Sequence, residues 1–122
     1  MQVEEAIKNI SNGKIAPVYV SLGTENYLQD KFKNFLLSLI PADQQEFNIG
    51  RYDMEVVNLS VALNDAMSLP FFGEYRLVII DRPYFLTGMR KKNSLDHDLN
   101  GLLKYLKNPE TATILEIGRA HV

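Results

Sequence analysis

The chain has no cysteine and only two histidines among its 122 residues. The lack of cysteine excludes disulfides, thiolate metal sites and cysteine nucleophiles. A basic excess is also missing, because 13 lysines and arginines face 15 acidic residues for a formal charge of −2. Domains that bind nucleic acid by themselves are normally basic. The composition therefore favours a protein as the partner.

Long hydrophobic runs are absent as well. No apolar stretch approaches the roughly 20 residues that span a bilayer. The first ten residues, MQVEEAIKNI, carry acids where a secretory signal carries basic residues and then a continuous apolar run. We expect a cytoplasmic protein with no membrane contact. With 46% apolar and 23% charged residues, the composition is that of one ordinary globular domain.

Four short apolar runs alternate with segments of helical periodicity. The first run ends at a glycine and has the continuous apolar pattern of a strand buried on both faces. The alternation predicts an α/β fold with a mostly parallel sheet of about four strands and helices on both faces. The expected strands are 16–23, 47–52, 75–81 and 111–115, and the expected helices are 24–40, 59–67 and 95–106.

The last seven residues, EIGRAHV, follow the fourth expected strand, where a doubly wound domain normally continues. A common sequencing adapter, read as codons, encodes the same seven residues followed by a stop codon. We therefore expect residues 1–115 to form a domain that is incomplete at its C-terminus, and residues 116–122 to be an artefactual tail. On this interpretation Arg119 and His121 have no function.

The turn after the first expected strand stands where a nucleotide hydrolase would bind phosphate. A P-loop needs the spacing G-x-x-x-x-G-K-[ST], but this turn has only Gly23, and the next lysine is Lys31. Asp81 ends the third expected strand, where P-loop enzymes hold the acid that orients magnesium. An aspartate at a strand end is more often a turn residue, and Arg82 follows it in place of a catalytic acid. A degenerate P-loop nucleotide hydrolase using Asp81 is the alternative function.

Two further polar features carry less weight. The basic triplet Arg90–Lys92 is compatible with phosphate contact, but a solvated loop fits the acidic chain better. His97 lies within the last expected helix and has no partner at the i, i+4 spacing of a metal pair. We therefore predict a surface histidine and no metal site.

The most informative stretch lies between the second expected helix and the third expected strand. Pro70 stops the helix and Gly73 starts the next turn, which leaves three large apolar residues on a stiff connection. Their side chains either pack beneath the helix or point outward, and composition favours neither. Exposed apolar anchors on a rigid loop are what a protein-binding wedge requires, since they fill partner pockets at low entropic cost. The three residues are Leu69, Phe71 and Phe72.

Three segments resemble a known bacterial family. They are PVYVSLGTENYLQDKF, AMSLPFFGEYRLVIIDRPYF and LLKYLKNPETATIL. Together they are similar to the N-terminal domain of the delta subunit of the bacterial DNA polymerase III clamp loader, of the Gram-positive type, over residues 15–115. The resemblance implies an AAA+-like α/β domain with a degenerate P-loop, no working nucleotide site and no cofactor.

In this family, apolar residues at the end of the short helix enter a pocket of the ring-shaped sliding clamp and loosen one of its interfaces. The resemblance therefore implies a clamp-binding wedge in this sequence. Pro70 separates its leucine from the aromatic pair, whereas some relatives have leucine and phenylalanine adjacent, so either phenylalanine is a candidate for the pocket. The residues that match the wedge are Met67, Ser68, Leu69, Phe71 and Phe72.

The resemblance also implies partners and further domains. The partner of the wedge is the sliding clamp, or beta subunit, and the other loader subunits, delta prime and tau/gamma, bind through C-terminal domains that this sequence lacks. DNA is reached only indirectly, through the assembled complex. ATP hydrolysis belongs to partner subunits, so we expect no chemistry from this chain itself. It would serve DNA replication as part of the DNA polymerase III holoenzyme, a DNA-directed DNA polymerase and thus a nucleotidyltransferase.

Overall fold

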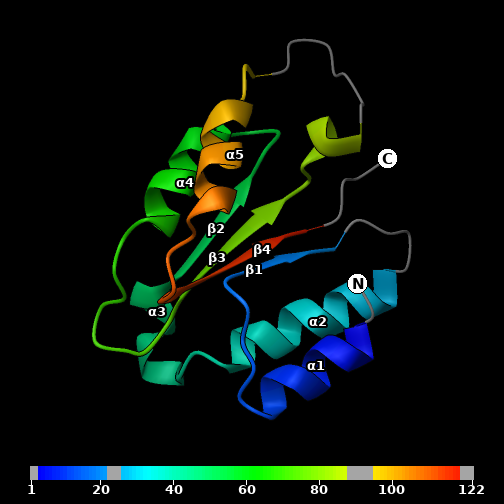
Figure 1. The fold of residues 1–122 in the computed structure, drawn as a ribbon, viewed down its shortest axis with the longest axis vertical. Helices are drawn as coiled ribbons and strands as arrows, with labels where there is room; N and C mark the ends of the chain where they lie inside the picture. Colours follow the sequence, from blue (N-terminus) through cyan, green and yellow to red (C-terminus); the bar gives the residue numbers. More distant parts are fainter. Residues whose placement is uncertain (1–2, 22–25, 88–94, 119–122) are drawn as a thin grey trace.

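The structure is a computed structural model that describes residues 3–21, 26–87 and 95–118. Helices and strands alternate along the chain (Figure 1). In chain order the elements are α1 (Val3–Ser11), β1 (Val18–Val20), α2 (Asn26–Ser38), the 3-10 turn η1 (Ala42–Gln44), α3 (Gln45–Asn48), β2 (Ile49–Asp53), α4 (Leu59–Ala66), β3 (Arg76–Asp81), the 3-10 turn η2 (Tyr84–Thr87), α5 (Leu99–Lys107) and β4 (Thr113–Ile117).

The four strands form one parallel sheet in the order β1-β4-β3-β2. In the central register, Leu115 lies opposite both Val18 and Val78. The sheet confirms the expected α/β fold. Because all strands run in the same direction, the loop that enters β3 and the turn that leaves it lie at opposite edges of the sheet.

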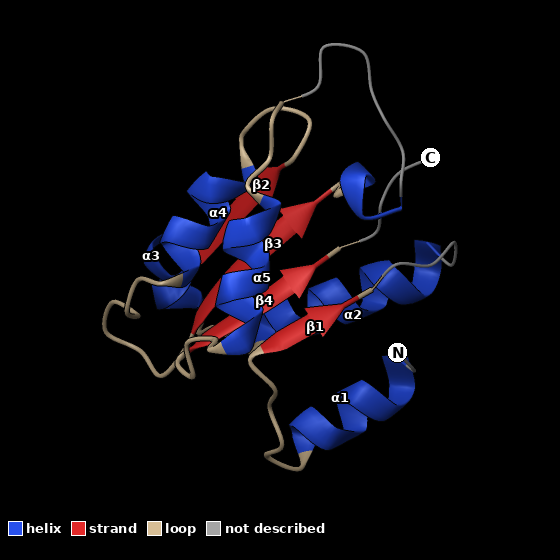
Figure 2. Ribbon diagram, turned by 45° about the horizontal axis from the view of Figure 1, so that its top comes forward, coloured by secondary structure: helices blue, strands red, loops and turns tan. Residues whose placement is uncertain are grey.

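Helices cover both faces of the sheet, with α1 and α2 on one side and α4 and α5 on the other (Figure 2). Strand β3 shows why both sides are apolar. Leu77 and Ile79 pack in the core on the α1 and α2 side, while Val78 and Ile80 pack in the core on the α4 and α5 side. Such a strand must be a continuous apolar run, as the sequence pattern indicated.

Strand β1 departs from the expectation that both of its faces are buried. Val20 is 39% exposed, and no residue of β1 is fully buried. The reason is that β1 is an outer strand of the sheet: within the described residues, only β4 pairs with it.

The second expected strand begins two residues late. Phe47 is in the short helix α3, and β2 starts at Ile49. The side-chain amide of Gln45 donates to the carbonyl of Ile40 at 3.1 Å, which ties this helical turn to the end of the preceding helix. Phe47 is therefore in a helical turn despite the strand preference of aromatic residues.

The last helix is shorter than the leucine spacing predicts. It begins at Leu99 because the Asp98 carboxylate accepts a hydrogen bond from the amide of Gly101 at 2.9 Å and caps the first turn. Leu95 and His97 therefore precede the helix, and the expectation of a helical His97 is wrong.

Strand β4 extends two residues beyond its expected end. Ile117 is 2% exposed and lies opposite Val20 and Ile80, and the Gly118 amide donates to the carbonyl of Ile80 at 2.8 Å. Residues 116 and 117 thus belong to the sheet. The foreign origin of residues 116–122 stays a prediction, and residues 119–122 lie outside the described part.

Candidate functional site

The loop that leaves α4 carries the most exposed large apolar side chains of the α4–β3 region. The exposed fraction is 75% for Leu69, 83% for Phe72 and 53% for both Met67 and Phe71. Ser68 is exposed as well. Residues Met67–Phe72, named the apolar loop below, therefore point outward, and the interpretation that all three large residues pack beneath the helix is wrong. The structure brings every residue of the expected wedge together.

Local sequence explains why the helix ends where the apolar loop begins. Asn58 caps α4 by accepting a hydrogen bond from the Ser60 amide at 2.9 Å, and Pro70 prevents the helix from continuing past Leu69. Phe72 then adopts a left-handed backbone with φ of 65°, which turns the chain towards β3. A left-handed backbone is energetically unfavourable for a residue other than glycine. Contacts with neighbouring residues must therefore hold Phe72 in this conformation.

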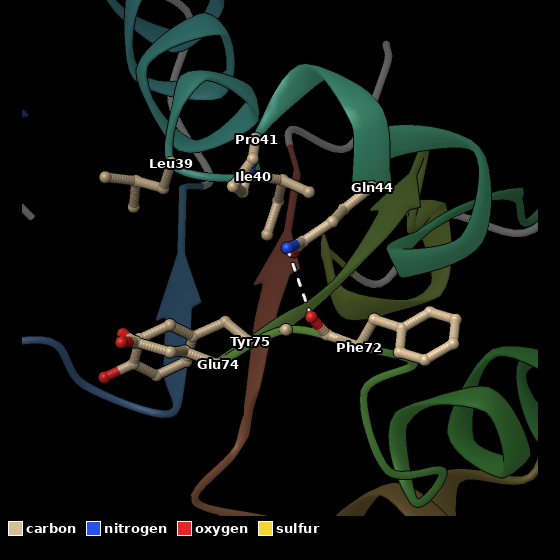
Figure 3. Close-up of a pocket in the computed structure, with 8 residues that line it drawn as sticks. Leu39, Ile40, Pro41, Gln44, Phe72, Glu74 and Tyr75 are labelled. Carbon is tan, nitrogen blue, oxygen red and sulfur yellow. Dashed lines mark hydrogen bonds between the residues drawn. The ribbon is translucent and has the colours of Figure 1, made fainter.

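Asn48 supplies the first of these contacts. Its side chain is fully buried, its Nδ2 donates to the carbonyl of Phe71 at 2.7 Å, and its Oδ1 accepts from the Phe71 amide at 2.6 Å. Both backbone groups of Phe71 are thus satisfied by one amide side chain. Gln44 adds a hydrogen bond to the carbonyl of Phe72 at 3.2 Å, while the ring of Phe72 points away from Leu39 (Figure 3).

An ion pair closes the base of the apolar loop. Asp65, at the end of α4, pairs with the Nε of Arg76 at the start of β3, and its other oxygen accepts from the hydroxyl of Tyr52. Burial and the hydrogen bond to Asp65 raise the pKa of Tyr52 to about 12, so the hydroxyl stays protonated and donates. On the same side, the Thr113 hydroxyl donates to the carbonyl of Ala66 at 2.8 Å. The end of α4, where the loop begins, is therefore anchored to β2, β3 and β4.

A side chain at Gly73, immediately after the loop, would displace the Gln44 side chain. A Cβ added to Gly73 would stand 2.2 Å from Oε1 of Gln44 and 3.1 Å from Nδ2 of Asn48. The two side chains that hold the loop therefore approach the backbone at this point. A cavity of about 470 Å³ borders the same segment and is lined by Leu39, Ile40, Pro41, Gln44, Phe72, Gly73, Glu74 and Tyr75 (Figure 3).

Helix α3 contributes two residues beside the apolar loop that were not expected from the sequence, Phe47 and Asn48. Phe47 was expected in a strand, but it is 50% exposed, and its ring centroid lies 5.5 Å from that of Phe71. Asn48 was not singled out at all. The only sequence signal for it is a polar residue directly before an apolar strand, which also occurs at ordinary turns.

Asp81, the residue of the alternative function, lies at the opposite edge of the sheet. Its Oδ1 accepts from Lys33 at 2.8 Å and its Oδ2 accepts from Arg51 at 2.7 Å. Burial raises the pKa of Asp81, but the hydrogen bonds from Arg51 and Lys33 outweigh it and hold the pKa below its ordinary value. Both oxygens are thus engaged by cations of the same chain. We name Lys33, Arg51 and Asp81 the charged edge.

Glu116 lies next to the charged edge but does not share its hydrogen bonds. It is 1% exposed, and among the described residues its Oε2 is the buried side-chain atom without a hydrogen-bond partner. Burial raises the pKa of Glu116 to about 7. A buried carboxylate without a partner destabilises a fold.

His97 is half-buried rather than a surface residue. Its ring lies against Phe85 with centroids 4.5 Å apart, and its Nδ1 accepts from the Leu59 amide at 2.9 Å, at the start of α4. Burial lowers the pKa of His97, and the neutral ring is the form that accepts a hydrogen bond at Nδ1. The residue therefore has a structural role, and the prediction of a surface histidine is wrong.

The described residues contain neither a metal-binding cluster nor a membrane-spanning helix. No group of three or more His, Asp or Glu side chains there is arranged to hold a metal ion. Across the same residues, no helix has the length and apolar character needed to cross a bilayer. The basic triplet Arg90–Lys92 lies outside the described residues.

Comparisons with known proteins agree on one family. The family model described as "DNA polymerase III, delta subunit" matches residues 19–118. DNA polymerase III subunit delta of Bacillus subtilis (strain 168) is 36% identical over 108 residues, which are 88% of this chain and 31% of that protein. The solved structure of the Bacillus subtilis DNA clamp loader delta protein (YqeN) aligns with a TM-score of 0.92 and 32% identity over 98% of this chain and 35% of that chain.

The chain spans about a third of the length of these two relatives. The family-model match covers β2, β3 and β4 in full, β1 from its second residue, and the apolar loop. The chain therefore belongs to the family of DNA polymerase III delta subunits.

Proposed function

We propose that this chain is a clamp-loader subunit of DNA replication that binds the ring-shaped sliding clamp through the apolar loop and loosens one interface of the ring. The observation that carries the proposal is the exposure of Leu69, Phe71 and Phe72 on a backbone whose polar groups are already satisfied. Burying such side chains in a partner is worth about 1.5 to 3 kcal/mol each. Because the loop is held in place, little conformational entropy is lost on binding.

Within the wedge, we assign the pocket residues to Leu69 and Phe72, with Met67 and Ser68 at the side. Phe72 is more exposed than Phe71, whose ring is flanked by Phe47 and Phe72 with centroids 5.5 and 4.3 Å away. Phe71 therefore supports the ring of Phe72.

We further propose that the chain performs no chemistry itself and acts within the cytoplasmic DNA polymerase III holoenzyme. Contacts with delta prime and tau/gamma would belong to the part of the family's sequence outside this chain, and DNA would be met only through the assembled complex. The state of Asp81 supports the absence of nucleotide hydrolysis, because both of its oxygens are bound by Lys33 and Arg51. A titration with magnesium and ATP is expected to show no binding, whereas saturable binding would support the hydrolase.

Two double variants test the wedge. We expect Leu69→Ala with Phe72→Ala to weaken binding to the cognate sliding clamp roughly a thousandfold, since each anchor contributes at least about 2 kcal/mol. Leu69→Ala with Phe71→Ala is expected to have a smaller effect. The matched control is Tyr27→Ala with Val56→Ala, which removes two side chains that are 74% and 70% exposed elsewhere on the chain.

Thermal unfolding of each variant accompanies the affinity measurement. Loss of binding with near-normal unfolding supports the proposal. It is overturned if both wedge variants bind the clamp normally, if both simply unfold, or if the control weakens binding as strongly.

A further inference from the structure

An aromatic residue outside the apolar loop is exposed beside it. Phe47 is in α3, more than twenty positions before Phe71 in the chain, yet their ring centroids are 5.5 Å apart. The ring centroid of Phe71 is in turn 4.3 Å from that of Phe72. The three rings therefore form one continuous row, of which Phe47 is the end on a different chain segment. Its exposed fraction of 50% means that contact with Phe71 covers only part of the side chain.

We propose that Phe47 is a further contact residue for the sliding clamp, so that the binding surface is formed by α3 and the apolar loop together. The inference rests on the proposed function, and it goes beyond it by adding a segment that the wedge does not include. The occupant is the same apolar surface of the clamp that receives Phe72, since the row of rings is uninterrupted.

The attachment of α3 to the loop gives the row a fixed geometry. Asn48, the residue after Phe47, holds the amide and the carbonyl of Phe71 through two hydrogen bonds of 2.6 and 2.7 Å. The carbonyl of Phe47 accepts from Arg76, which also pairs with Asp65 at the base of the loop. Phe47 and Phe71 are therefore positioned by one hydrogen-bond network rather than independently.

Such an arrangement favours binding for a physical reason. A half-exposed ring on a fixed backbone loses few rotamers when a partner covers it, because a phenylalanine has only two side-chain torsions. Aromatic anchors of this kind carry a large share of interface energy. A purely structural role would account for the half of Phe47 that the fold covers, but it leaves the solvent-exposed half without a role.

The test compares Phe47→Ala with the wild-type chain in clamp affinity and in thermal unfolding. We expect about a tenfold loss of affinity, the size typical of a contact beside the central anchors, with a small change in unfolding. Tyr27→Ala is the matched control, because Tyr27 is an exposed aromatic residue at the start of α2, outside both α3 and the apolar loop. We expect the control to bind normally.

A second measurement separates direct contact from an effect through Phe71. A photo-crosslinking benzophenone amino acid at position 47 keeps an aromatic ring there, and we expect it to form a covalent product with the clamp, whereas the same amino acid at position 27 does not. Weakened binding by Phe47→Ala without a crosslink from position 47 would overturn the contact.

The outcome also distinguishes this inference from the proposed function. If the Leu69 and Phe72 double variant weakens binding while Phe47→Ala binds normally, the contact of Phe47 is wrong and the wedge stands. If neither variant changes binding, the wedge itself is wrong.

Discussion

The two edges of the sheet use their polar groups in opposite ways. At the charged edge, Lys33 and Arg51 bind the two oxygens of Asp81, so this carboxylate is fully engaged within the chain. At the other edge, Asn48 satisfies the backbone of Phe71, and the apolar side chains of the loop are left facing solvent. At one edge the carboxylate is occupied by cations of the same chain, and at the other edge apolar side chains are exposed to solvent.

This difference supports the proposed role of the domain as a binding module. Ligands of open parallel sheets normally bind at the carboxyl ends of the strands, which is the position of the charged edge. Here that position is taken up by an internal ion-pair network. The apolar loop lies at the amino ends of the strands, where stable anchoring of the backbone, rather than a ligand, determines its shape.

The largest effect on the fold is expected at Asn48. Replacing it by alanine leaves the amide and carbonyl of Phe71 without partners and opens a small cavity, which should lower the free energy of unfolding by about 2 to 4 kcal/mol. Denaturant unfolding measures this loss. Asn48→Asp keeps an acceptor for the Phe71 amide but places a buried carboxylate against the Phe71 carbonyl, so at pH 7 it should lower the free energy of unfolding at least as much. An Asn48→Ala chain of unchanged stability would show that the loop does not depend on this contact.

Replacing Glu116, next to the charged edge, should have the opposite effect on the free energy of unfolding. Glu116→Leu removes the buried carboxylate and should raise the free energy of unfolding by about 2 to 3 kcal/mol at pH 8. Because the folded pKa is raised to about 7, the folded chain binds more protons than the unfolded chain between about pH 4.5 and 7, and the wild-type loses stability as pH rises through this window. The gain from Glu116→Leu should therefore shrink at pH 5. An equal gain at both pH values would contradict the buried charge.

Asp81→Asn is expected to lower the stability of the fold without changing its affinity for the clamp. It leaves Lys33 and Arg51 without their anionic partner and should cost about 1 kcal/mol of stability in urea unfolding at pH 7, since the pair is partly exposed. The affinity for the clamp should not change, because the charged edge is remote from the apolar loop. Since the folded pKa is lowered, this stabilisation is present at neutral pH and disappears as pH falls through the folded value. A loss of clamp binding in Asp81→Asn would contradict the separation of the two edges.

The smallest effect is expected from His97. Its pKa is lowered by burial, so the unfolded chain takes up the proton more readily, and stability should fall as pH drops below about 6.5. The slope is measured in a Glu116→Leu background, which removes the opposing titration. His97→Gln retains an acceptor for the Leu59 amide and should flatten the slope. If the slope persists in His97→Gln, another group is responsible.

The sequence alone predicted the elements whose signal is local. The apolar run of β3, the helix stop at Pro70 and the stretch Leu69–Phe72 follow from periodicity and turn chemistry. It left open whether the loop side chains point outward, because exposure depends on what packs against the loop. The contacts that hold the loop come from Asn48 in α3 and from Arg76 at the start of β3.

Other residues were misjudged for the same reason. The absence of an i, i+4 metal partner predicted a surface histidine at position 97, whereas the partners of His97, Leu59 and Phe85, are distant in sequence. Phe47 has a residue type that favours strands, but it lies in α3, where its carbonyl accepts from Arg76 and the next residue, Asn48, bonds to Phe71. Long-range contacts, which no window of sequence contains, determine both positions.

Amide hydrogen exchange of the chain, alone and with saturating sliding clamp, tests the central claim most directly. It reports both edges of the sheet in one experiment. We predict slower exchange on binding in residues 66–75 and in α3, and unchanged exchange in residues 51–55 and around Asp81. Slower exchange confined to the charged edge, with the apolar loop unaffected, would contradict the assignment of the apolar loop as the clamp-binding surface.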